Sequence, residues 1–271
     1  MTIALVINAY NQPEYLKRVL KAVARQNRLP EEVLLADDGS SDDVRELFQN
    51  WSARQSCRCA HLWQKNEGFR RARILNLAIA EARSEYLVFL DGDTLPHPYF
   101  IADHHAVARP KFFVQGHRAL VKRKAAAWFG SNDFYADRRR AILLNQISSL
   151  KNIFRWPFPV CRPQANLRGI RGCNLAIWRN DLVLVNGYNE AFTGWGREDS
   201  ELATRLMNAG VQRLDLRGRA ICFHLWHPPA SRSGLAANEK LLEIARSQNV
   251  NWCELGLSGH FSASSSANIK R

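Results

Sequence analysis

The sequence contains no apolar run of membrane-spanning length, no C-x-x-C pair, and no G-x-G-x-x-G motif after its first apolar stretch. That stretch, MTIALVINAY, is too short for a signal peptide and has no basic region before it, so we expect a β-strand there and a cytoplasmic protein. The six cysteines are expected to be mostly reduced and buried, because 271 residues need no disulfide framework. The missing glycine motif argues against a dinucleotide-binding fold.

Positive charge exceeds negative charge, since 38 basic and 25 acidic residues give a formal net charge of +13. Such an excess favours anionic partners, which include nucleotide phosphates, anionic lipid and nucleic acid. Charge does not choose among these three. Hydrophobic residues make up 46% of the chain, so we expect a substantial folded core.

Apolar stretches and amphipathic stretches alternate along the first hundred residues. The apolar ones include IALVI, EEVLLAD and YLVFL, and helical spacing lies between them at 14–26, from 42 onward and at 70–82. Strands that alternate with helices of this length pair in parallel through crossover connections. We therefore predict an α/β fold, with an open, mostly parallel sheet flanked by helices.

Polar residues follow several of the predicted strands, at the edge where such sheets bind ligands. Asp91 and Asp93 flank a glycine after YLVFL, and two carboxylates at this spacing suit Mg²⁺ or Mn²⁺ and a diphosphate. A solvated Asp-Gly turn is the alternative. Asn8 follows the first strand, and Asp37 or Asp38 after the second strand could accept hydrogen bonds from a base or ribose.

The segment GWGREDSEL precedes a predicted helix and sets two acids in its first turn. Complementation of the helix dipole would explain Glu198 and Asp199, but it does not explain Trp195 between two glycines. An indole face stacks well on a sugar ring, and a neighbouring carboxylate can act as general base toward a hydroxyl group. This segment is therefore a candidate acceptor site.

Two further motifs carry chemistry that bears on the carboxylate pair. In CFHLWHPP, a neutral imidazole from one of the two histidines, His224 and His227, could complete the metal site, although single histidines near apolar stretches are more often structural. In FRRAR, a guanidinium could lie near phosphate or an acceptor anion, and a solvated helical face is an equally weighted alternative.

A basic and aromatic stretch interrupts the chain at 121–167, and we interpret it as a partly mobile helical insertion that faces acceptor or membrane. The spacing of apolar residues from Ile142 to Ile153 predicts a helix. The runs 122–124 and 138–140 are consistent with attraction to an anionic membrane or acceptor. Regular structure resumes at 168–257, and the Ser-rich tail at 258–271 is predicted to be disordered.

Taken together, several motifs resemble the bacterial family-2 glycosyltransferases, and the last three resemble the galactosyltransferase-type C-terminal half, similar to chondroitin-polymerase-like domains. The resemblance covers about residues 1–120 and 168–230. The motifs are ALVINAYNQPEYL, LLADDGSSDD, NEGFRRARILNLAIAEA, YLVFLDGD, GCNLAIWRNDLVLVNGYNEAFTGWGREDSEL and FHLWHPP.

This resemblance implies a GT-A (Rossmann-like) fold and an inverting, metal-dependent transfer from a UDP-sugar. The implied roles are metal binding by Asp93 and His224, with His227 as second choice; nucleotide binding by Asn8, Tyr10, Asp37, Asp38, Arg73 and Asp91; acceptor binding by Trp195 and Glu198; and catalysis as general base by Asp199.

Two departures from the family pattern concern charge. Arg197 stands where many relatives carry a glycine, beside the proposed base, and this implies a different acceptor choice. Leu75 precedes Asn76 where relatives of the chondroitin-polymerase type carry an arginine, so the phosphate-binding role could pass to Arg70 or Arg73 or be absent.

The expected function is transfer of a hexose or N-acetylhexosamine to a glycan or lipid-linked glycan, in the synthesis of cell-surface polysaccharide or lipopolysaccharide. Residues 1–120 would bind the nucleotide sugar and 168–257 the acceptor. An anionic membrane surface is a further candidate partner, with the protein peripheral at its cytoplasmic face, and no specific nucleic acid is expected. The alternatives are a basic nucleic-acid-binding protein, suggested by the charge and interleaved aromatics, and a catalytically silent sugar-binding relative.

Overall fold

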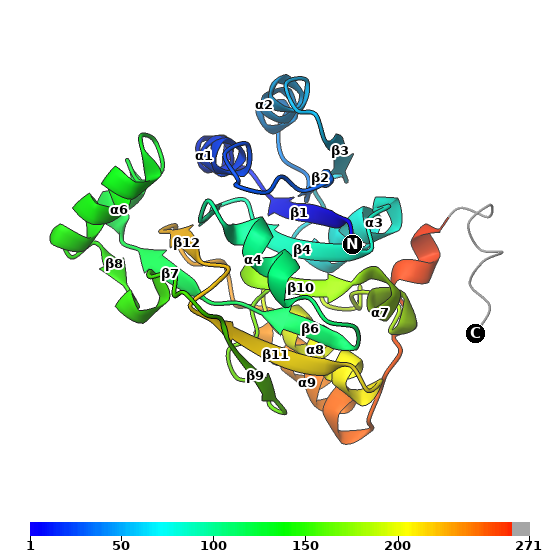
Figure 1. Ribbon diagram of the computed structural model, residues 1–271. Helices are drawn as coiled ribbons and strands as arrows, with labels where there is room; N and C mark the ends of the chain where they lie inside the picture. Colours follow the sequence, from blue (N-terminus) through cyan, green and yellow to red (C-terminus); the bar gives the residue numbers. More distant parts are fainter. Residues whose placement is uncertain (262–271) are drawn as a thin grey trace.

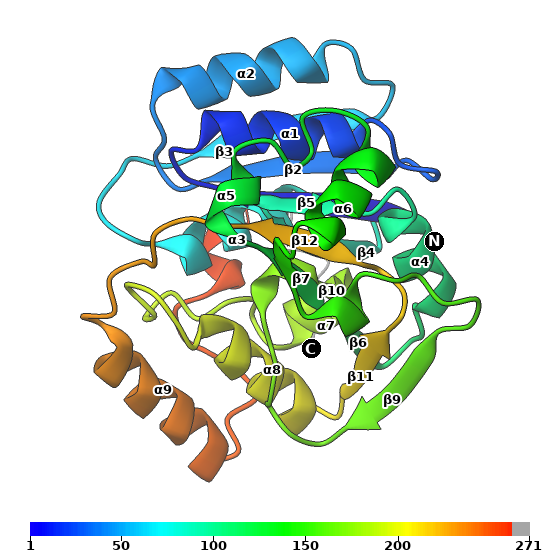
Figure 2. The same cartoon turned by 90° about the vertical axis from the view of Figure 1, so that its left-hand side faces the viewer.

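The structure, a computed structural model, describes residues 1–261 and contains an eight-stranded sheet beside a four-stranded one (Figures 1 and 2). The strand order of the large sheet is β3-β2-β1-β4-β10-β6-β11-β9. Only β10 and β9 run against the other strands, so the prediction of a mostly parallel open sheet flanked by helices is confirmed. The strands of this sheet are β1 (Ile3–Ala9), β2 (Glu32–Asp37), β3 (Arg58–Trp63), β4 (Tyr86–Asp91), β6 (Phe112–Gln115), β9 (Val160–Gln164), β10 (Leu175–Trp178) and β11 (Gln212–Arg217).

Helices cover both faces of the large sheet and form two separate cores. They are α1 (Pro13–Val23), α2 (Asp42–Ser52), α3 (Arg71–Glu81), α4 (Phe100–Val107), α5 (Arg123–Ala126), α6 (Phe134–Leu143), α7 (Arg179–Leu184), α8 (Glu198–Asn208) and α9 (Leu235–Ser247), with 3₁₀ turns η1 (Leu150–Asn152), η2 (Gly172–Asn174) and η3 (Leu257–His260). Ile3, Leu5 and Ile7 pack with α1, α2 and α4 on one face. Ala4 and Val6 pack with α3, α7 and α8 on the other. This alternation follows from the two-residue period of a strand.

The local sequence of α1 explains where this helix begins and which of its faces is buried. Pro13 occupies its first position, where a missing amide hydrogen costs nothing. Its apolar residues recur at helical spacing, so that one face of α1 is buried against the sheet. The helix therefore holds the end of β1, and with it Asn8, in a fixed place.

Strand register brings the predicted polar residues to one edge of the sheet. β1 pairs in parallel with both β2 and β4, and Asn8 lies opposite Asp91 while Ala9 lies opposite Asp37. Parallel strands end on the same side of a sheet, which is where ligands bind in such folds. The sequence-based expectation of a ligand site at this edge is therefore consistent with the register.

The four-stranded sheet was not predicted from the sequence. Its order is β5-β12-β7-β8, formed by β5 (Thr94–Pro96), β12 (Cys222–Leu225), β7 (Arg118–Val121) and β8 (Ile147–Ser148). These strands have only two to four residues, too few for alternation to be recognised. The sheet joins the segment after Asp93 to the segment that carries His224.

The region at 121–167 differs from the predicted helical insertion. The prediction of a helix from Ile142 to Ile153 is wrong, since α6 ends at Leu143 and the backbone turns at Asn145 (φ 50°) and Ser149 (φ 63°), both left-handed. Asn tolerates that conformation better than most residues, which favours an end to the helix. β8 and β9 follow, and β9 forms an edge of the large sheet.

The prediction of a disordered tail from residue 258 is wrong at its start. The 3₁₀ turn η3 covers residues 258–260, and Leu257, the first residue of η3, is fully buried in the core beneath α3. The remainder of that prediction, 262–271, lies outside the described residues. Among residues 1–261 all six cysteines are free and half of them are buried. Within this range no helix is long and apolar enough to span a membrane.

Candidate active site

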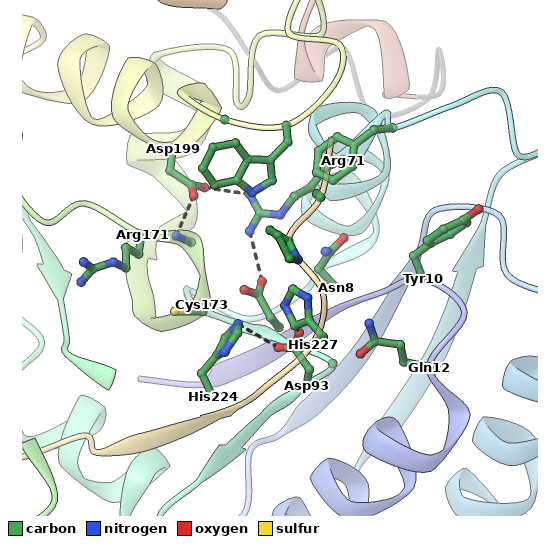
Figure 3. A pocket seen from close by; sticks show the side chains of 18 of the residues that line it. Asn8, Tyr10, Gln12, Arg71, Asp93, Arg171, Cys173, Asp199, His224 and His227 are labelled. Atoms are coloured by element: carbon green, nitrogen blue, oxygen red, sulfur yellow. Dashed lines mark hydrogen bonds and ion pairs between the residues drawn. The ribbon is translucent and has the colours of Figure 1, made fainter. Parts of the chain in front are cut away.

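A cleft of about 890 Å³ opens at the carboxyl edge of the large sheet (Figure 3). The end of β1, the end of β4, the strand β12 and the first turn of α8 all contribute to its walls. Asp91 and Asp93 reach it from one motif, Trp195 and Asp199 from another, and His224 from a third. The structure thus brings the first of these segments together with two others that lie more than 100 residues further along the chain.

One carboxylate and two imidazoles form a cluster in the cleft. Asp93 Oδ2 lies 3.0 Å from His227 Nε2, and Asp93 Oδ1 lies 3.6 Å from His224 Nε2. The possible ligand atoms of all three residues lie within 4.8 Å of one another. The geometry follows from pairing of β12 with β5, which sets His224 opposite Thr94, next to Asp93.

The charge states of this cluster suit cation binding. Burial lowers the pKa of His224 to about 4, so its imidazole is neutral at neutral pH and has a lone pair available. Burial alone would raise the pKa of Asp93, but the hydrogen bond from His227 and the charges of both imidazoles lower it. The hydrogen bond to Asp93 raises the pKa of His227. A carboxylate oxygen and two imidazole nitrogens are donors that Mn²⁺ accepts.

Arg71 is the centre of an ion-pair network beside the metal-ligand candidates. Its Nη1 donates to Asp199 Oδ1 at 2.8 Å and to Glu198 Oε1 at 3.1 Å, and its Nη2 lies 3.4 Å from Asp91 Oδ1. Arg71 is almost fully buried at the first position of α3. One guanidinium therefore neutralises carboxylates from β4 and α8 and joins the two halves of the site (Figure 3).

The carboxylate of Asp199 is held on two sides. Its Oδ1 accepts from Arg71, and its Oδ2 accepts from the amide of Gly172 at 2.7 Å. A Cβ at Gly172 would lie 2.5 Å from Asp199 Oδ1 and 2.2 Å from Arg71 Nη2, so only glycine fits there without displacement. Asp199 remains partly accessible from the cleft, as a residue that meets a substrate must be.

The other acids near Arg71 have altered proton affinity. Burial, reinforced by the charge of Asp199, raises the pKa of Glu198 to about 7 against the opposing effect of Arg71. Burial raises the pKa of Asp91 to about 6, also against Arg71. Such closely spaced carboxylates repel one another, so Arg71 decides how many of them stay ionised.

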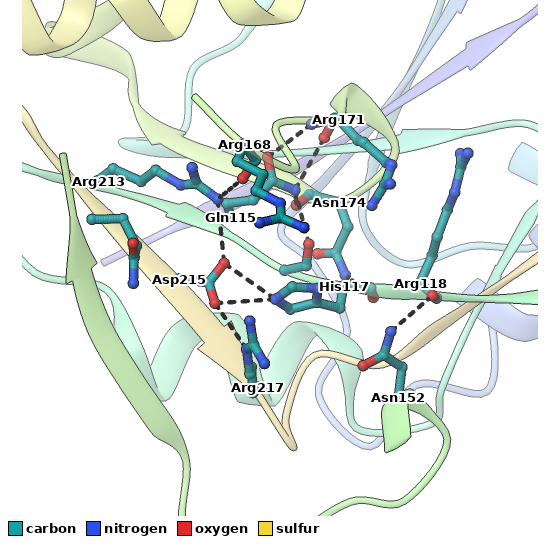
Figure 4. Close-up of polar contacts among 12 residues, drawn as sticks. Gln115, His117, Arg118, Asn152, Arg168, Arg171, Asn174, Arg213, Asp215 and Arg217 are labelled. Carbon is teal, nitrogen blue, oxygen red and sulfur yellow. Dashed lines mark hydrogen bonds and ion pairs between the residues drawn. The ribbon is translucent and has the colours of Figure 1, made fainter. Parts of the chain in front are cut away.

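A polar network behind the cleft holds the segment that carries Gly172 (Figure 4). Gln115 accepts from the amide of Arg171 at 3.0 Å and donates to the carbonyl of Asn174 at 2.9 Å. The Asn174 side chain in turn donates to the carbonyl of His117 at 2.9 Å. Through these contacts β6 fixes the turn η2, and η2 fixes Asp199.

Comparison with known proteins identifies the family. The model of glycosyl transferase family 2 matches residues 4–159, more than half of the chain. The chain belongs to this family. A second family model, the N-terminal domain of galactosyltransferase, matches residues 153–228. Family-2 members use nucleotide-sugar donors, and the chain is a glycosyltransferase.

Curated relatives are similar over most of the chain. It is 29% identical over 231 residues to validoxylamine A glucosyltransferase of Streptomyces hygroscopicus subsp. limoneus. The aligned region covers 77% of this chain and 48% of that protein. The chain is 23% identical over 251 residues to chondroitin synthase of Escherichia coli, which covers 85% of this chain and 35% of that protein. The chain spans less than half the length of each of these relatives.

Solved structures show the same fold at low identity. GalNAc-T7, crystallised with UDP, GalNAc and Mn²⁺, superposes with a TM-score of 0.66 and 13% identity, covering 90% of this chain and 48% of that one. S. aureus TarS 1-349 in complex with UDP gives a TM-score of 0.62 and 15% identity, covering 100% of this chain and 76% of that one. These neighbours are GT-A glycosyltransferases, and the predicted GT-A fold is confirmed.

The loop before α8 presents an aromatic side chain to the cleft of this glycosyltransferase. Trp195 lines the cleft with 40% of its surface exposed, between Gly194 (φ 75°) and Gly196 (φ 106°). The left-handed backbone at both positions favours glycine. Arg197 adopts φ 79° and pairs with Glu239 on α9 at 2.6 Å, so its charge is shared with α9 rather than with Asp199.

The residues assigned to the nucleotide fall into two groups. Asn8, Tyr10 and Asp91 line the cleft. The other three have internal partners and lie outside its lining. Asp37 is fully buried, and its Oδ2 lies 2.9 Å from His61 Nε2. Asp38 accepts hydrogen bonds from the side chain of Gln64 and from the backbone amide of Arg70. Arg73 donates to Gln64 Oε1 at 2.7 Å.

The sequence pointed to the FRRAR segment but not to the arginine that matters. Arg71 lies on the buried face of α3 with Ile74, Leu75 and Ala78, so the helical period of 3.6 residues was a usable signal. Arginine is rarely buried unless paired, which is why the sequence left a solvated helical face as an equally weighted alternative. His227, the second choice from the sequence, lies nearer to Asp93 (3.0 Å between Nε2 and Oδ2) than His224 does (3.6 Å between Nε2 and Oδ1).

Proposed function

We propose that this glycosyltransferase moves a hexose or N-acetylhexosamine from a UDP-sugar to a hydroxyl of a glycan, with inversion and with Mn²⁺ or Mg²⁺ bound. In this proposal residues 1–120 bind the nucleotide sugar and 168–257 the acceptor. The observation that carries the proposal is the cluster of Asp93, His224 and His227 in the same cleft as Asp199.

Asp93 and His224 would hold the cation, with His227 as a further ligand. The donor set supports this, because a carboxylate and two imidazoles, of which that of His224 is neutral, offer ligand atoms within 4.8 Å of one another. When bound, a divalent cation supplies charge neutralisation for the diphosphate leaving group. The Mn²⁺ named with UDP in the GalNAc-T7 structure is consistent with this role.

Asp199 would act as the general base. Its fixed carboxylate would accept the proton of the acceptor hydroxyl while that oxygen attacks the anomeric carbon, the bond from that carbon to the diphosphate oxygen breaks, and UDP leaves. A single displacement of this kind inverts the anomeric configuration. Trp195 would stack on the acceptor sugar, and Glu198 would contact its hydroxyl groups. The two donors that orient Asp199 support this assignment.

The nucleotide would bind at the carboxyl edge of β1, β2 and β4. Asn8, Tyr10 and Asp91 are available from the cleft itself. Asp37, Asp38 and Arg73 complete the proposed set, and each would have to exchange an internal hydrogen bond for one to the nucleotide. UDP in the TarS and GalNAc-T7 structures supports uridine as the base.

The acceptor would be a glycan or a lipid-linked glycan used in cell-surface polysaccharide or lipopolysaccharide synthesis. The net charge of +13 supports an anionic acceptor or membrane surface, with the protein peripheral at the cytoplasmic face. Membership of a glycosyltransferase family favours this function over nucleic-acid binding.

Thermal stabilisation by a panel of UDP, GDP, CMP and TDP sugars tests the proposal, with Mn²⁺ and separately with chelator. A ligand that binds only the native state raises the melting temperature. We expect stabilisation by UDP-sugars that requires Mn²⁺. A flat response to the whole panel, together with salt-dependent binding to DNA or RNA, would contradict the proposal and support the nucleic-acid alternative.

A further inference from the structure

Exposed apolar side chains are concentrated between α6 and β9. Of the eighteen large apolar residues that are exposed among the described residues, six lie within the sixteen residues 143–158. Leu143 and Phe158 are 86% and 80% exposed, more than any other residue in this class. We call these six residues the apolar rim: Leu143, Leu144, Leu150, Phe154, Trp156 and Phe158.

The segment that carries the apolar rim is also rich in positive charge. Residues 122–158 contain eight basic and two acidic side chains, which is six of the thirteen net positive charges in less than a seventh of the chain. Seven of the eight have no carboxylate within 4 Å in the part of the chain that the structure describes. These seven are Lys122, Arg123, Lys124, Arg138, Arg139, Arg140 and Lys151.

The apolar rim adjoins the cleft that contains the proposed active site. Leu120 and Val121 of β7 line the cleft, and β7 pairs with β8, which lies inside the segment 143–158. Arg123 lies over the ring of Trp226, itself a cleft residue, at 4.8 Å. Figure 1 shows α6 and β8 at one extreme of the molecule, opposite α7.

We propose that the apolar rim and the seven cations around it form a docking surface for an anionic lipid bilayer. Leucine and aromatic side chains enter the region between headgroups and acyl chains, while lysine and arginine remain with the anionic headgroups. The apolar side chains of the rim are exposed, and none of the seven cations has a carboxylate partner among residues 1–261, although Lys122 and Arg138 donate to backbone carbonyls and Arg123 and Arg140 lie over tryptophan rings.

The chemistry favours a bilayer over the other possible occupants. A second copy of this chain would bring the same positive charge against itself, which costs free energy at a desolvated contact. Single-stranded nucleic acid uses aromatic side chains as stacking platforms, whereas the aliphatic Leu143, at the end of α6, and Leu144, directly after it, are 86% and 54% exposed.

The consequence for the acceptor rests on the proposed function. With the rim in the bilayer, the side of the cleft formed by β7 faces the membrane, so a lipid-linked glycan can reach the site without leaving the bilayer. Docking itself does not depend on catalysis, and the two proposals can therefore fail separately.

Co-sedimentation with vesicles tests the docking surface. The full chain is mixed with phosphatidylcholine vesicles or with vesicles that also contain phosphatidylglycerol, at low and high salt. The test variant is Leu143→Asp/Leu144→Asp, which changes two exposed side chains and leaves the core intact. The matched control is Leu184→Asp/Leu255→Asp, because these leucines are also exposed but lie on α7 and just before η3.

We expect the wild type and the control to bind anionic vesicles, and the test variant to bind about tenfold more weakly or worse. Equal binding by all three proteins, or no binding by the wild type, would overturn the proposal. A wild-type dimer in sedimentation velocity that becomes monomeric in the test variant would also overturn it. UDP stabilisation with Mn²⁺, measured on the same samples, reports separately on the proposed function.

Discussion

Single residues decide the chemistry of the cleft, and Arg71 is the clearest case. It is a buried cation that contacts the carboxylates of Asp91, Glu198 and Asp199 and orients the last of these. The sequence motifs predicted the acids because acids at strand and helix ends are easily recognised. The motifs could not identify the counterion of these acids. Three arginines stand within four positions at 70–73, and only burial distinguishes Arg71 from the other two.

Asp199→Asn tests the proposed base. The amide has nearly the same shape but cannot accept the proton, and its NH₂ group replaces one of the two oxygens that accept from Arg71 and Gly172, so kcat should fall by about 10²–10⁴-fold while UDP binding is retained. Steady-state kinetics and thermal stabilisation by UDP measure the two effects. Asp42→Asn, at an exposed position on α2, is the matched control. Turnover at the wild-type rate would remove Asp199 from this role.

Arg71→Met tests the ion-pair network. The variant leaves three buried or half-buried carboxylates without their cation, so the free energy of unfolding should fall by about 3–5 kcal/mol. Arg45→Met removes an exposed pair with Asp42 and should cost less than about 1 kcal/mol. Urea unfolding measures the free energy of unfolding of both variants. Equal decreases in the two variants would show that Arg71 has no special structural role.

Glu198 should make stability depend on pH. Its pKa is raised from 4.5 to about 7, so the folded state keeps a proton that the unfolded chain releases. The stabilisation is complete below about pH 4.5 and is lost as the pH rises through 7, on the order of 3 kcal/mol. Urea unfolding across this range should show a flatter profile for Glu198→Gln. Parallel profiles for the two proteins would refute the assignment.

At the scale of elements, the sequence predicted the helices and strands that follow one another along the chain better than it predicted the pairing of strands far apart in sequence. The alternation from β1 to β4 could be predicted because each crossover is local and each strand is long. The four-stranded sheet could not, because β5 and β12 are short and 125 residues separate their ends. The position of the candidate metal ligands depends on that pairing, so the sequence identified the residues but not their geometry.

The turn η2 offers a prediction at this scale. Gly172→Ala would introduce a Cβ within 2.2 Å of Arg71 Nη2 and 2.5 Å of Asp199 Oδ1, so both side chains must move. We expect kcat to fall about tenfold or more, with little change in the melting temperature. Gly259→Ala, where nothing lies within 4 Å, is the control. Wild-type kcat in Gly172→Ala would show that η2 does not position the base.

At the scale of the whole molecule, charge is divided between two regions with different roles. The cleft balances its acids with Arg71, and the segment 122–158 carries a surplus of cations beside exposed apolar side chains. Composition alone predicted attraction to anions but could not locate it. In the two proposals the fold separates the site for the nucleotide diphosphate from the surface for anionic lipid.

The most direct test of the central claim is calorimetric titration of UDP into the wild type and into Asp93→Ala, each with Mn²⁺ and with chelator. We predict that UDP binds the wild type with Mn²⁺ and that chelation or the Asp93→Ala change each weakens binding by about 10²-fold. The same dissociation constant under all four conditions would contradict a metal-dependent nucleotide-sugar site at Asp93.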